Sequence, residues 1–303
     1  MAVPGPVLSF DRAFEPHTGQ AIPVADGITR ITAPNASAYT FSGTNSFLLG
    51  HERLAVVDPG PDDAAHMVAL KAAIGVRKVD AIILSHTHRD HSASAARLGT
   101  ELGAPLWFGG RHRLSRPLRR FERNPIRKSC DWDLVPDRTL DDGEVFAAGD
   151  LTITAHTTPG HCANHLVFST GDILLSGDHV MGWNSTLVSV PDGSMAAYFA
   201  SLDKVIAMPQ QTYVPAHGGP IADGPTYAKA LRAHRQMRND QVLEAVKGGA
   251  RAISAIVAHI YPKQAIPVRL AAAMTINAHV EYLETLGRLS VSRGLLGMRI
   301  VAA

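Results

Sequence analysis

Residues 85–91 have the sequence Ser-His-Thr-His-Arg-Asp-His, which brings three imidazoles and one carboxylate close together along the chain. The groups are His86, His88, Asp90 and His91, and they follow the apolar run 81–84. So many polar side chains beside a buried strand are difficult to satisfy with hydrogen bonds alone. Neutral imidazole and carboxylate are, however, the usual ligands of a divalent metal ion. The segment therefore predicts a metal site rather than a polar surface loop.

Four further fragments place Asp or His directly after an apolar stretch that is typical of a strand, or in the loop that follows it. They are Asp58 in Asp-Pro-Gly-Pro, His161 in Thr-Pro-Gly-His, Asp178 in Ser-Gly-Asp-His and His217 in Pro-Ala-His-Gly. Loops at strand ends commonly carry functional side chains. Each fragment alone is weak, because a single histidine in such a place is more often a hydrogen-bonded core or surface residue than a ligand.

Together and in this order, the five fragments resemble the signature of the metallo-β-lactamase superfamily. The resemblance covers about residues 20–222 and implies an α/β fold, the αβ/βα sandwich, with a dinuclear metal site at one edge of its two sheets. It implies that the first ion is held by His86, His88 and His161, the second by Asp90, His91 and His217, and that Asp178 bridges them. Asp58 is expected to orient the ligand loop through hydrogen bonds.

A dinuclear site of this kind favours hydrolysis. Two ions roughly 3.5–4 Å apart lower the pKa of bound water from about 15.7 to about 7, so that a bridging hydroxide is the nucleophile. They also stabilise the negative charge of the transition state. Asp90 is the candidate catalytic residue that accepts or relays a proton, although that role competes with its role as a ligand. Zinc is the first choice of metal, and iron or manganese are the alternatives.

Other polar residues near the motifs have two interpretations. His165 and His179 either contact substrate or support the ligands by hydrogen bonding. Trp183 either forms a pocket wall or packs in the interior. Cys162 is interpreted as a buried structural residue.

The elements that position these residues are predicted from apolar runs and turn residues. Strands are expected at residues 28–31, 46–49, 54–57, 81–84, 106–108, 144–147, 151–156, 166–169, 173–176 and 212–214. Helices are expected at residues 61–73, 92–102 and 194–208. The basic segment 111–128 is predicted to be a partly helical insertion. This mixture favours a layered α/β domain.

The pattern changes after Pro225. Helices are predicted at 226–247, 253–260 and 268–286, and a hairpin with its turn at Arg293-Gly294 follows. Three helices and a hairpin are the outline of a winged helix. We therefore expect a catalytic domain over residues 1–225 and a small winged-helix-like domain over residues 226–303. The segments 176–183 and 278–283 resemble the beta-lactamase-like protein 2 subgroup, whose members carry such a C-terminal domain.

The bulk composition limits the location of the protein. Of its 303 residues, 46% are hydrophobic, which is enough for a large and a small domain. The sequence contains no run of eighteen apolar residues, so no membrane span is predicted. Residues 1–23 lack the basic start and the apolar stretch of a secretion signal, and two cysteines are too few for a disulfide framework. A cytoplasmic location is therefore expected.

The charge is unevenly distributed although the net charge is only +2. The segment 111–128 contains eight Lys and Arg residues and one Glu. Such an asymmetry can steer an anionic substrate toward one face. The alternative is that exposed arginines only keep the protein in solution.

Three classes of function follow. The preferred one is hydrolysis of a thioester, ester or lactone bond in an anionic small molecule, with the C-terminal domain as a lid or as the surface of a homodimer. The alternative, which the resemblance to the beta-lactamase-like protein 2 subgroup implies, is an endoribonuclease that cleaves single-stranded RNA. The uneven charge supports it, because phosphate contacts dominate nucleic-acid affinity. Little interleaving of aromatic and basic residues weakens that alternative. A DNA-binding regulator ranks last, because the third C-terminal helix is too apolar to recognise a groove.

Overall fold

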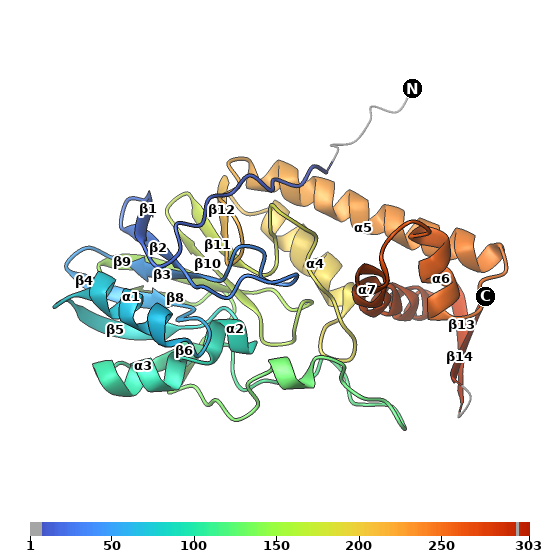
Figure 1. Ribbon diagram of the computed structural model, residues 1–303, viewed down its shortest axis with the longest axis horizontal. Helices are drawn as coiled ribbons and strands as arrows, with labels where there is room; N and C mark the ends of the chain where they lie inside the picture. Colours follow the sequence, from blue (N-terminus) through green and yellow to red (C-terminus); the bar gives the residue numbers. More distant parts are fainter. Residues whose placement is uncertain (1–7, 295–296) are drawn as a thin grey trace.

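Two β-sheets lie face to face in the left half of the molecule as drawn in Figure 1. The computed structural model describes residues 8–294 and 297–303. The first sheet has the order β1 (Ala21–Ala25), β2 (Ile28–Thr32), β3 (Asn45–Leu49), β4 (Arg53–Val57), β5 (Lys78–Ile83), β6 (Leu106–Phe108) and β7 (Arg138–Thr139). The second has the order β12 (Thr212–Pro215), β11 (Ile173–Gly177), β10 (Leu166–Thr170), β9 (Leu151–Thr157) and β8 (Val145–Ala148).

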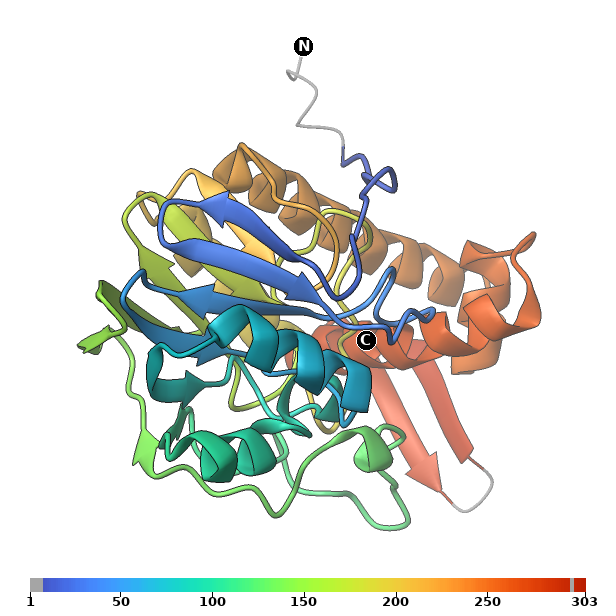
Figure 2. The ribbon, with the colours of Figure 1, turned by 60° about the vertical axis from the view of Figure 1, so that its left-hand side comes forward.

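Helices cover the outer face of each sheet (Figure 2). The first sheet packs on α1 (Ala64–Ile74) and α3 (Ala95–Leu102), and the second packs on α4 (Met195–Ile206) and the first half of α5 (Gly224–Lys247). The layers are therefore helix, sheet, sheet, helix. This confirms the predicted αβ/βα sandwich.

The core between the sheets consists of apolar side chains from both inner faces. Phe47 and Val57 of the first sheet belong to one buried cluster with Phe168 and Val214 of the second. The second halves of strands β3 to β5 are buried on both faces, which explains the apolar runs 47–49, 54–57 and 81–83. Strand β8 lies at a sheet edge and alternates between exposed and buried residues.

Strand direction explains how distant residues meet. β4, β5 and β6 are parallel to one another, and β11 is parallel to β12. β9 and β11 are both antiparallel to β10, so they point the same way. The loops after β4, β5, β9, β11 and β12 carry all the predicted site residues.

The C-terminal part follows the predicted order of three helices and a hairpin. The second half of α5 packs with α6 (Ile253–Ile260), α7 (Ile266–Thr285), β13 (Leu289–Gly294) and β14 (Gly297–Ala302). These elements lie together at the right of Figure 1. Ala228 and Leu231 of α5 instead join the cluster of α4 and the second sheet, so α5 connects both parts.

Several predicted element boundaries are wrong. The first helix begins at Ala64 rather than Pro61, since the Asp63 side chain accepts a hydrogen bond from the backbone N–H of His66 at 2.8 Å and caps it. The predicted helix 92–102 divides into α2 (Arg89–Ser92) and α3.

The segment 111–128 contains no α-helix, and only the short 3-10 helix η1 (Arg127–Ser129) begins at its end. Strands β1 and β7 were not predicted. β13 extends through Arg293 and Gly294, where a turn was expected, and residues 295–296 lie outside the described residues.

Within the described residues, we find no helix whose length and apolar character would suit a bilayer crossing.

The core between the sheets predicts that replacing a buried phenylalanine lowers the free energy of unfolding much more than replacing an exposed one. Phe168 is 1% exposed, whereas Phe121 is 73% exposed. We expect Phe168→Ala to lower the free energy of unfolding by about 3–5 kcal/mol, because it leaves a cavity. Phe121→Ala is the control and should change it by less than about 0.5 kcal/mol. Urea unfolding followed by circular dichroism measures both. Equal effects of the two substitutions would contradict the packing described.

Candidate metal centre

The seven residues predicted to bind metal come from four segments that each follow a strand, and they lie side by side. His86, His88, Asp90 and His91 follow β5, His161 follows β9, Asp178 follows β11, and His217 follows β12. Six of the seven are buried, and Asp90 is part-exposed. The structure thus brings together every predicted site residue, while their role as ligands stays a prediction.

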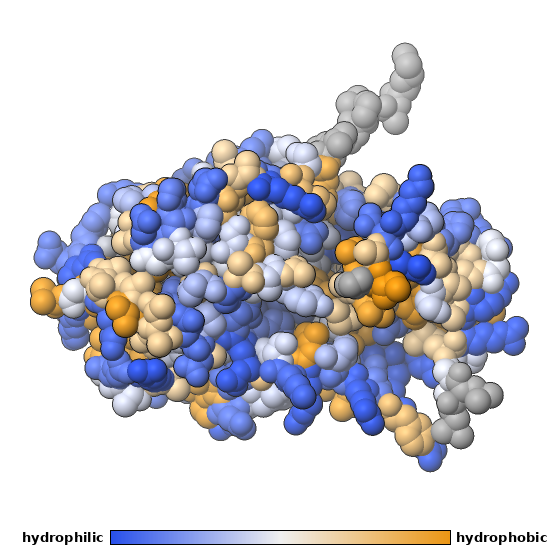
Figure 3. Space-filling view, viewed as in Figure 1, coloured by the Kyte–Doolittle hydropathy of each residue, from blue (hydrophilic) through white to orange (hydrophobic). Residues whose placement is uncertain are grey.

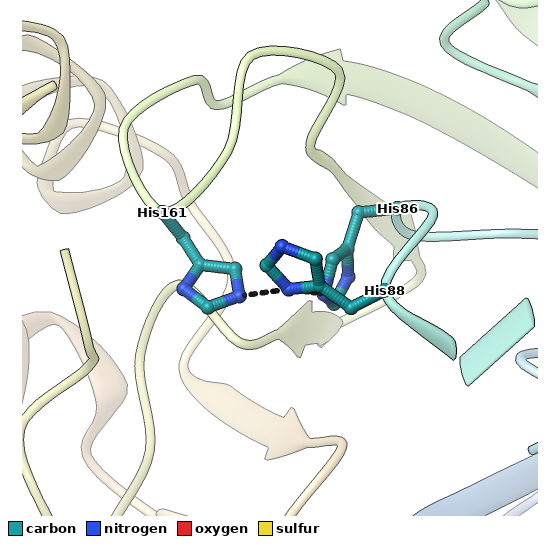
Figure 4. A group of neighbouring side chains, drawn as sticks. All are labelled: His86, His88 and His161. Atoms are coloured by element: carbon teal, nitrogen blue, oxygen red, sulfur yellow. Dashed lines mark hydrogen bonds between the residues drawn. The ribbon is translucent and has the colours of Figure 1, made fainter. Parts of the chain in front are cut away.

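Three histidines form one cluster (Figure 4). His88 Nδ1 lies 3.0 Å from His86 Nε2 and 2.8 Å from His161 Nε2. The three rings come from two loops and present one nitrogen each to the same point. Nitrogens bound to one zinc ion at about 2.0–2.1 Å lie roughly 2.9–3.4 Å apart, so these separations suit shared coordination.

In two of these rings, the nitrogen that points away from the cluster faces an atom that can only accept a hydrogen bond. His88 Nε2 lies 3.1 Å from Asp192 Oδ2, and His161 Nδ1 lies 2.7 Å from the carbonyl oxygen of Leu187. These nitrogens must carry the ring protons. His88 Nδ1 and His161 Nε2 therefore each carry a lone pair and no proton in the neutral rings, so neither can donate a hydrogen bond to the other.

In His86, too, the ring proton lies on the nitrogen that points away from the cluster, because that nitrogen faces the hydroxyl oxygen of Ser85. The Ser85 hydroxyl donates to Asp58 Oδ2 at 2.6 Å, so its oxygen accepts from His86 Nδ1 at 3.0 Å. His86 Nε2 is then the third lone pair in the cluster. Three lone pairs directed at one point repel one another unless a cation lies between them.

The second cluster contains two histidines and two carboxylates. His217 Nε2 lies 3.3 Å from both Asp90 Oδ2 and Asp178 Oδ1. His91 Nε2 lies 3.4 Å from Asp90 Oδ2 and 3.6 Å from Asp178 Oδ1. Asp178 also reaches the first cluster, since its Oδ2 lies 3.5 Å from His161 Nε2. One oxygen of Asp178 therefore faces each cluster, as a bridging ligand would.

The ring protons of the second cluster are also directed away from the centre. His91 Nδ1 donates to Asp58 Oδ2 at 3.0 Å, and His217 Nδ1 donates to the carbonyl of Gly43 at 3.2 Å. His91 Nε2, His217 Nε2 and Asp178 Oδ1 are buried and have no hydrogen-bond partner among the described residues. Orphaned acceptors of this kind fit divalent metal ions, which prefer these nitrogen and oxygen donors.

The carboxylates change the proton affinity of the second cluster. Burial alone would lower the pKa of His217, but the carboxylates of Asp178 and Asp90 outweigh it and raise the pKa to about 9. Burial opposes the charge of Asp90 as well, yet His91 and His217 hold its pKa well below the ordinary value. In the metal-free protein, protons bound to histidines of this cluster therefore supply the positive charge that metal ions would otherwise supply.

Asp58 supports the ligand loop as the sequence predicts. It is 1% exposed, and its Oδ1 accepts a hydrogen bond from the backbone N–H of Ser85 at 2.7 Å. Its backbone φ of +50° lies in the left-handed region, which is uncommon outside glycine and marks a constrained site.

His165 acts on the backbone of a predicted ligand rather than on substrate. The N–H of Asp178 donates to His165 Nε2 at 3.1 Å, and His165 Nδ1 pairs with Thr158 Oγ1 at 2.8 Å. A Cβ on Gly177 would come within 2.7 Å of His165 Nε2, so only glycine fits there. Of the two interpretations of His165, the structure supports hydrogen-bonded support of a ligand.

Asp192 is a supporting residue that the sequence did not reveal. Its buried carboxylate accepts hydrogen bonds from His88, from His112 Nε2 at 2.8 Å and from Asn124 Nδ2 at 3.2 Å. Burial favours its neutral form, but the hydrogen bonds from His112 and His88 keep its pKa below the ordinary value. In the sequence it lies in Pro-Asp-Gly, which indicates only a turn.

The other residues in question are also placed. His179 is fully buried and packs against Tyr198, with ring centroids 4.9 Å apart. Cys162 is fully buried and donates to Asn164 Oδ1, which agrees with a structural role. Trp183 stacks on Phe41 and also lines a cavity, so it combines both predicted roles.

A cavity of about 490 Å³ opens directly over the two clusters. Its floor includes His88, Asp90, His161 and Asp178. Its walls come from loops of both sheets, from η1 and from α7, and they include Tyr39, Arg89, Ile126, Lys128, Trp183 and Met274. A reactant in this cavity would meet the metal-binding groups on one side and apolar or basic side chains on the others.

The raised pKa of His217 predicts that metal binding releases protons. At pH 7 the metal-free site should hold at least one proton, which a divalent ion must displace. Zinc affinity should therefore fall as the pH decreases below about 9, and binding at pH 7 should release about one proton or more. Calorimetric titration in buffers of different ionisation enthalpy measures this release. Zinc binding at pH 7 without proton release would show that the assigned protonation is wrong.

The hydrogen bonds of Asp192 predict that it tunes metal affinity. We expect Asp192→Asn to weaken zinc binding by about 10- to 100-fold, since it disturbs the orientation of His88. Asp203→Asn, which changes an exposed carboxylate on α4, is the matched control. Competition with a chromogenic chelator compares the two variants. Equal affinities would remove Asp192 from the site.

Comparison with known sequences identifies the family. The model of the metallo-beta-lactamase superfamily matches residues 39–217. A Drosophila melanogaster protein named beta-lactamase-like protein 2 homolog is 27% identical over 284 residues, which cover 89% of this chain and 92% of that protein. An Aspergillus chevalieri protein named atrochrysone carboxyl ACP thioesterase is 29% identical over 229 residues, or 73% of this chain and 66% of that protein.

Solved structures agree with this result. A beta-lactamase domain protein from Burkholderia ambifaria has a TM-score of 0.79 at 23% identity and covers 98% of this chain and 97% of its own. A metallo-beta-lactamase family protein from Thermus thermophilus has a TM-score of 0.75 at 25% identity, with coverage of 93% and 100%. The chain therefore belongs to the metallo-beta-lactamase superfamily and is a metal-dependent hydrolase.

Proposed function

We propose that this chain is a dinuclear metal hydrolase that cleaves a thioester, ester or lactone bond in an anionic small molecule. The observation that carries the proposal is the position of the acceptor clusters at the floor of the cavity, beneath apolar walls and the two basic side chains Arg89 and Lys128. Such a cavity suits a molecule with an apolar part, a reactive carbonyl and a negative charge.

The donor set supports two ions. His86, His88 and His161 would hold the first, and Asp90, His91 and His217 the second, with Asp178 shared between them. Zinc is the metal we propose, because histidine and carboxylate donors suit it, and iron or manganese are alternatives. When bound, such ions polarise a carbonyl oxygen and lower the pKa of water.

The protein side chains then have separate roles. Arg89 and Lys128 attract the anionic part of the substrate, while Tyr39, Trp183 and Met274 enclose its apolar part. Asp90 is part-exposed at the cavity floor, so its position makes it the candidate to accept a proton from water, while its low pKa makes it a weak base. The thioesterase name of the fungal relative supports an acyl bond as the target.

Cleavage of single-stranded RNA is the second candidate. The exposed bases Arg123 and Arg127, in the groove beside the cavity, support it, because they could contact phosphates. DNA binding by α7 is disfavoured, since Ala278, Val280 and other α7 residues are buried against the rest of the protein.

We further propose that residues 1–225 form the catalytic domain and residues 226–303 a winged-helix-like domain. The presence of Met274 from α7 in the cavity wall supports a role of the second domain in enclosing substrate. A homodimer stays a prediction, and its candidate surface is the apolar patch of Ile266, Val268 and Leu270 at α7 (Figure 3). The cytoplasmic location also stays a prediction.

An activity screen tests the proposal. Zinc-loaded protein should hydrolyse an acyl thioester or a lactone, and removal of metal by a chelator should abolish the activity. His88→Ala should lower kcat/KM by at least about 100-fold, because it removes a metal ligand. His51→Ala, which alters an exposed histidine just before β4, should change kcat/KM little. Metal-dependent cleavage of labelled RNA without hydrolysis of any ester would favour the second candidate instead.

A further inference from the structure

A second groove of about 490 Å³ adjoins the cavity over the metal centre. Pro125 and Lys128 line both spaces, so the two lie side by side. The groove is formed by the basic segment and the residues just after it, and its walls include Leu114, Leu118, Arg123, Arg127 and Trp132. It therefore combines apolar surface with positive charge beside the reactive centre.

The bases of the segment divide into paired and unpaired groups. Arg116 contacts both Glu122 and Glu281 at 2.6–2.7 Å, and Arg119 contacts Glu281 at 2.6 Å. The groove residue Glu122 is thus neutralised.

By contrast, Arg123, Arg127 and Lys128 are exposed and form no ion pair with the described residues. Hydrophilic residues are prominent along the lower edge in Figure 3, where this segment lies. The groove consequently has three free positive charges.

The segment that carries these three bases is held in place although it has little regular structure. Glu281 belongs to α7, so its ion pairs attach the segment to the C-terminal helices. Asn124 donates to the buried Asp192 at 3.2 Å, and Trp132 Nε1 donates to the carbonyl of Arg127 at 2.9 Å. The Arg127 guanidinium also lies 4.9 Å from the centre of the Trp132 ring. The groove is therefore preorganised for an anion.

We propose that this groove binds the phosphate of a phosphate-bearing thiol, and that the substrate is an acyl thioester of that thiol. This inference rests on the proposed function. The acyl group lies in the apolar cavity, the carbonyl lies over the metal centre, and the leaving arm passes Lys128 into the groove. Arginine and lysine are the side chains that best recognise phosphate, and Leu114 and Leu118 suit the uncharged part of the arm.

The reaction is a hydrolysis and needs no further reactant. The oxygen of water bonds to the acyl carbon, and the bond between that carbon and sulfur breaks. One proton of the water reaches the sulfur to give the thiol, and the other leaves the new carboxylic acid for solvent. The phosphate is unchanged, so it contributes to binding alone.

A substrate series with one acyl group tests the proposal on the zinc-loaded full chain. The thioesters of pantetheine, 4′-phosphopantetheine and coenzyme A differ in the presence of phosphate. We expect kcat/KM to be about 10- to 100-fold higher with phosphate than without it, mainly through KM.

The double variant Arg123→Gln/Arg127→Gln should reduce this ratio to below about 3-fold. Arg97→Gln/Arg232→Gln, which alters exposed bases on α3 and α5, should keep it. The same acyl group on a phosphopantetheine-bearing carrier protein shows whether the arm is free or protein-bound, and a phosphate preference on either source supports the proposal.

Binding measured without turnover tests the phosphate-binding groove independently of the proposed hydrolase activity. The S-methyl thioether of 4′-phosphopantetheine should change the fluorescence of Trp132, while S-methyl pantetheine should not, and Trp132→Phe identifies the signal. Phosphate-dependent binding with no hydrolysis of any ester would defeat the proposed function and leave the groove assignment standing. Equal kcat/KM with and without phosphate in the unchanged protein would overturn the groove assignment and leave the proposed function standing.

Discussion

The candidate metal centre is governed by one constraint: many hydrogen-bond acceptors lie close together with no hydrogen-bond donor between them. Five imidazole lone pairs and two carboxylates face one small volume, because every ring proton is directed outward to a carbonyl, a carboxylate or a hydroxyl. Acceptors that converge in this way repel one another unless positive charge lies between them. Cations resolve the conflict, as protons on His91 and His217 in the metal-free protein or as metal ions in the loaded protein.

The sandwich makes this arrangement possible. The loops that follow the core strands of the two sheets lie at the same edge of the sandwich. The apolar cluster between the sheets fixes the positions of those strand ends relative to one another. Buried polar residues then fix the orientation of each ring. Asp58 supports His86 through Ser85 and supports His91 directly, while Asp192 supports His88. The end of the basic segment with η1, and Met274 of α7, complete the walls of the cavity above.

The sequence was most informative where chemistry and local structure coincide. The cluster at residues 85–91 and the single residues after later strands are short motifs that can be recognised in the sequence, and their convergence was implied by the resemblance to the superfamily. Asp192 could not be predicted, because its role depends on His88, which lies 104 residues earlier, and on His112. The same limit applies to Glu281, which pairs with Arg116 across 165 residues.

The errors in secondary structure have a similar origin. The segment 111–128 has helix-forming arginines, yet Arg116 and Arg119 contact Glu281 of α7, and prolines at 117 and 125 oppose a continuous helix. Strand β7 has only two residues and is defined by its pairing with β6, which no local pattern reveals.

The most direct measurement of the central claim is a crystal structure of zinc-soaked protein with anomalous data collected at the zinc edge. Two anomalous peaks are expected, roughly 3.5–4 Å apart, with the Asp178 carboxylate between them and the six other side chains within about 2.0–2.2 Å of one peak or the other. Absence of zinc from this edge of the sandwich, or a single ion held elsewhere, would contradict it.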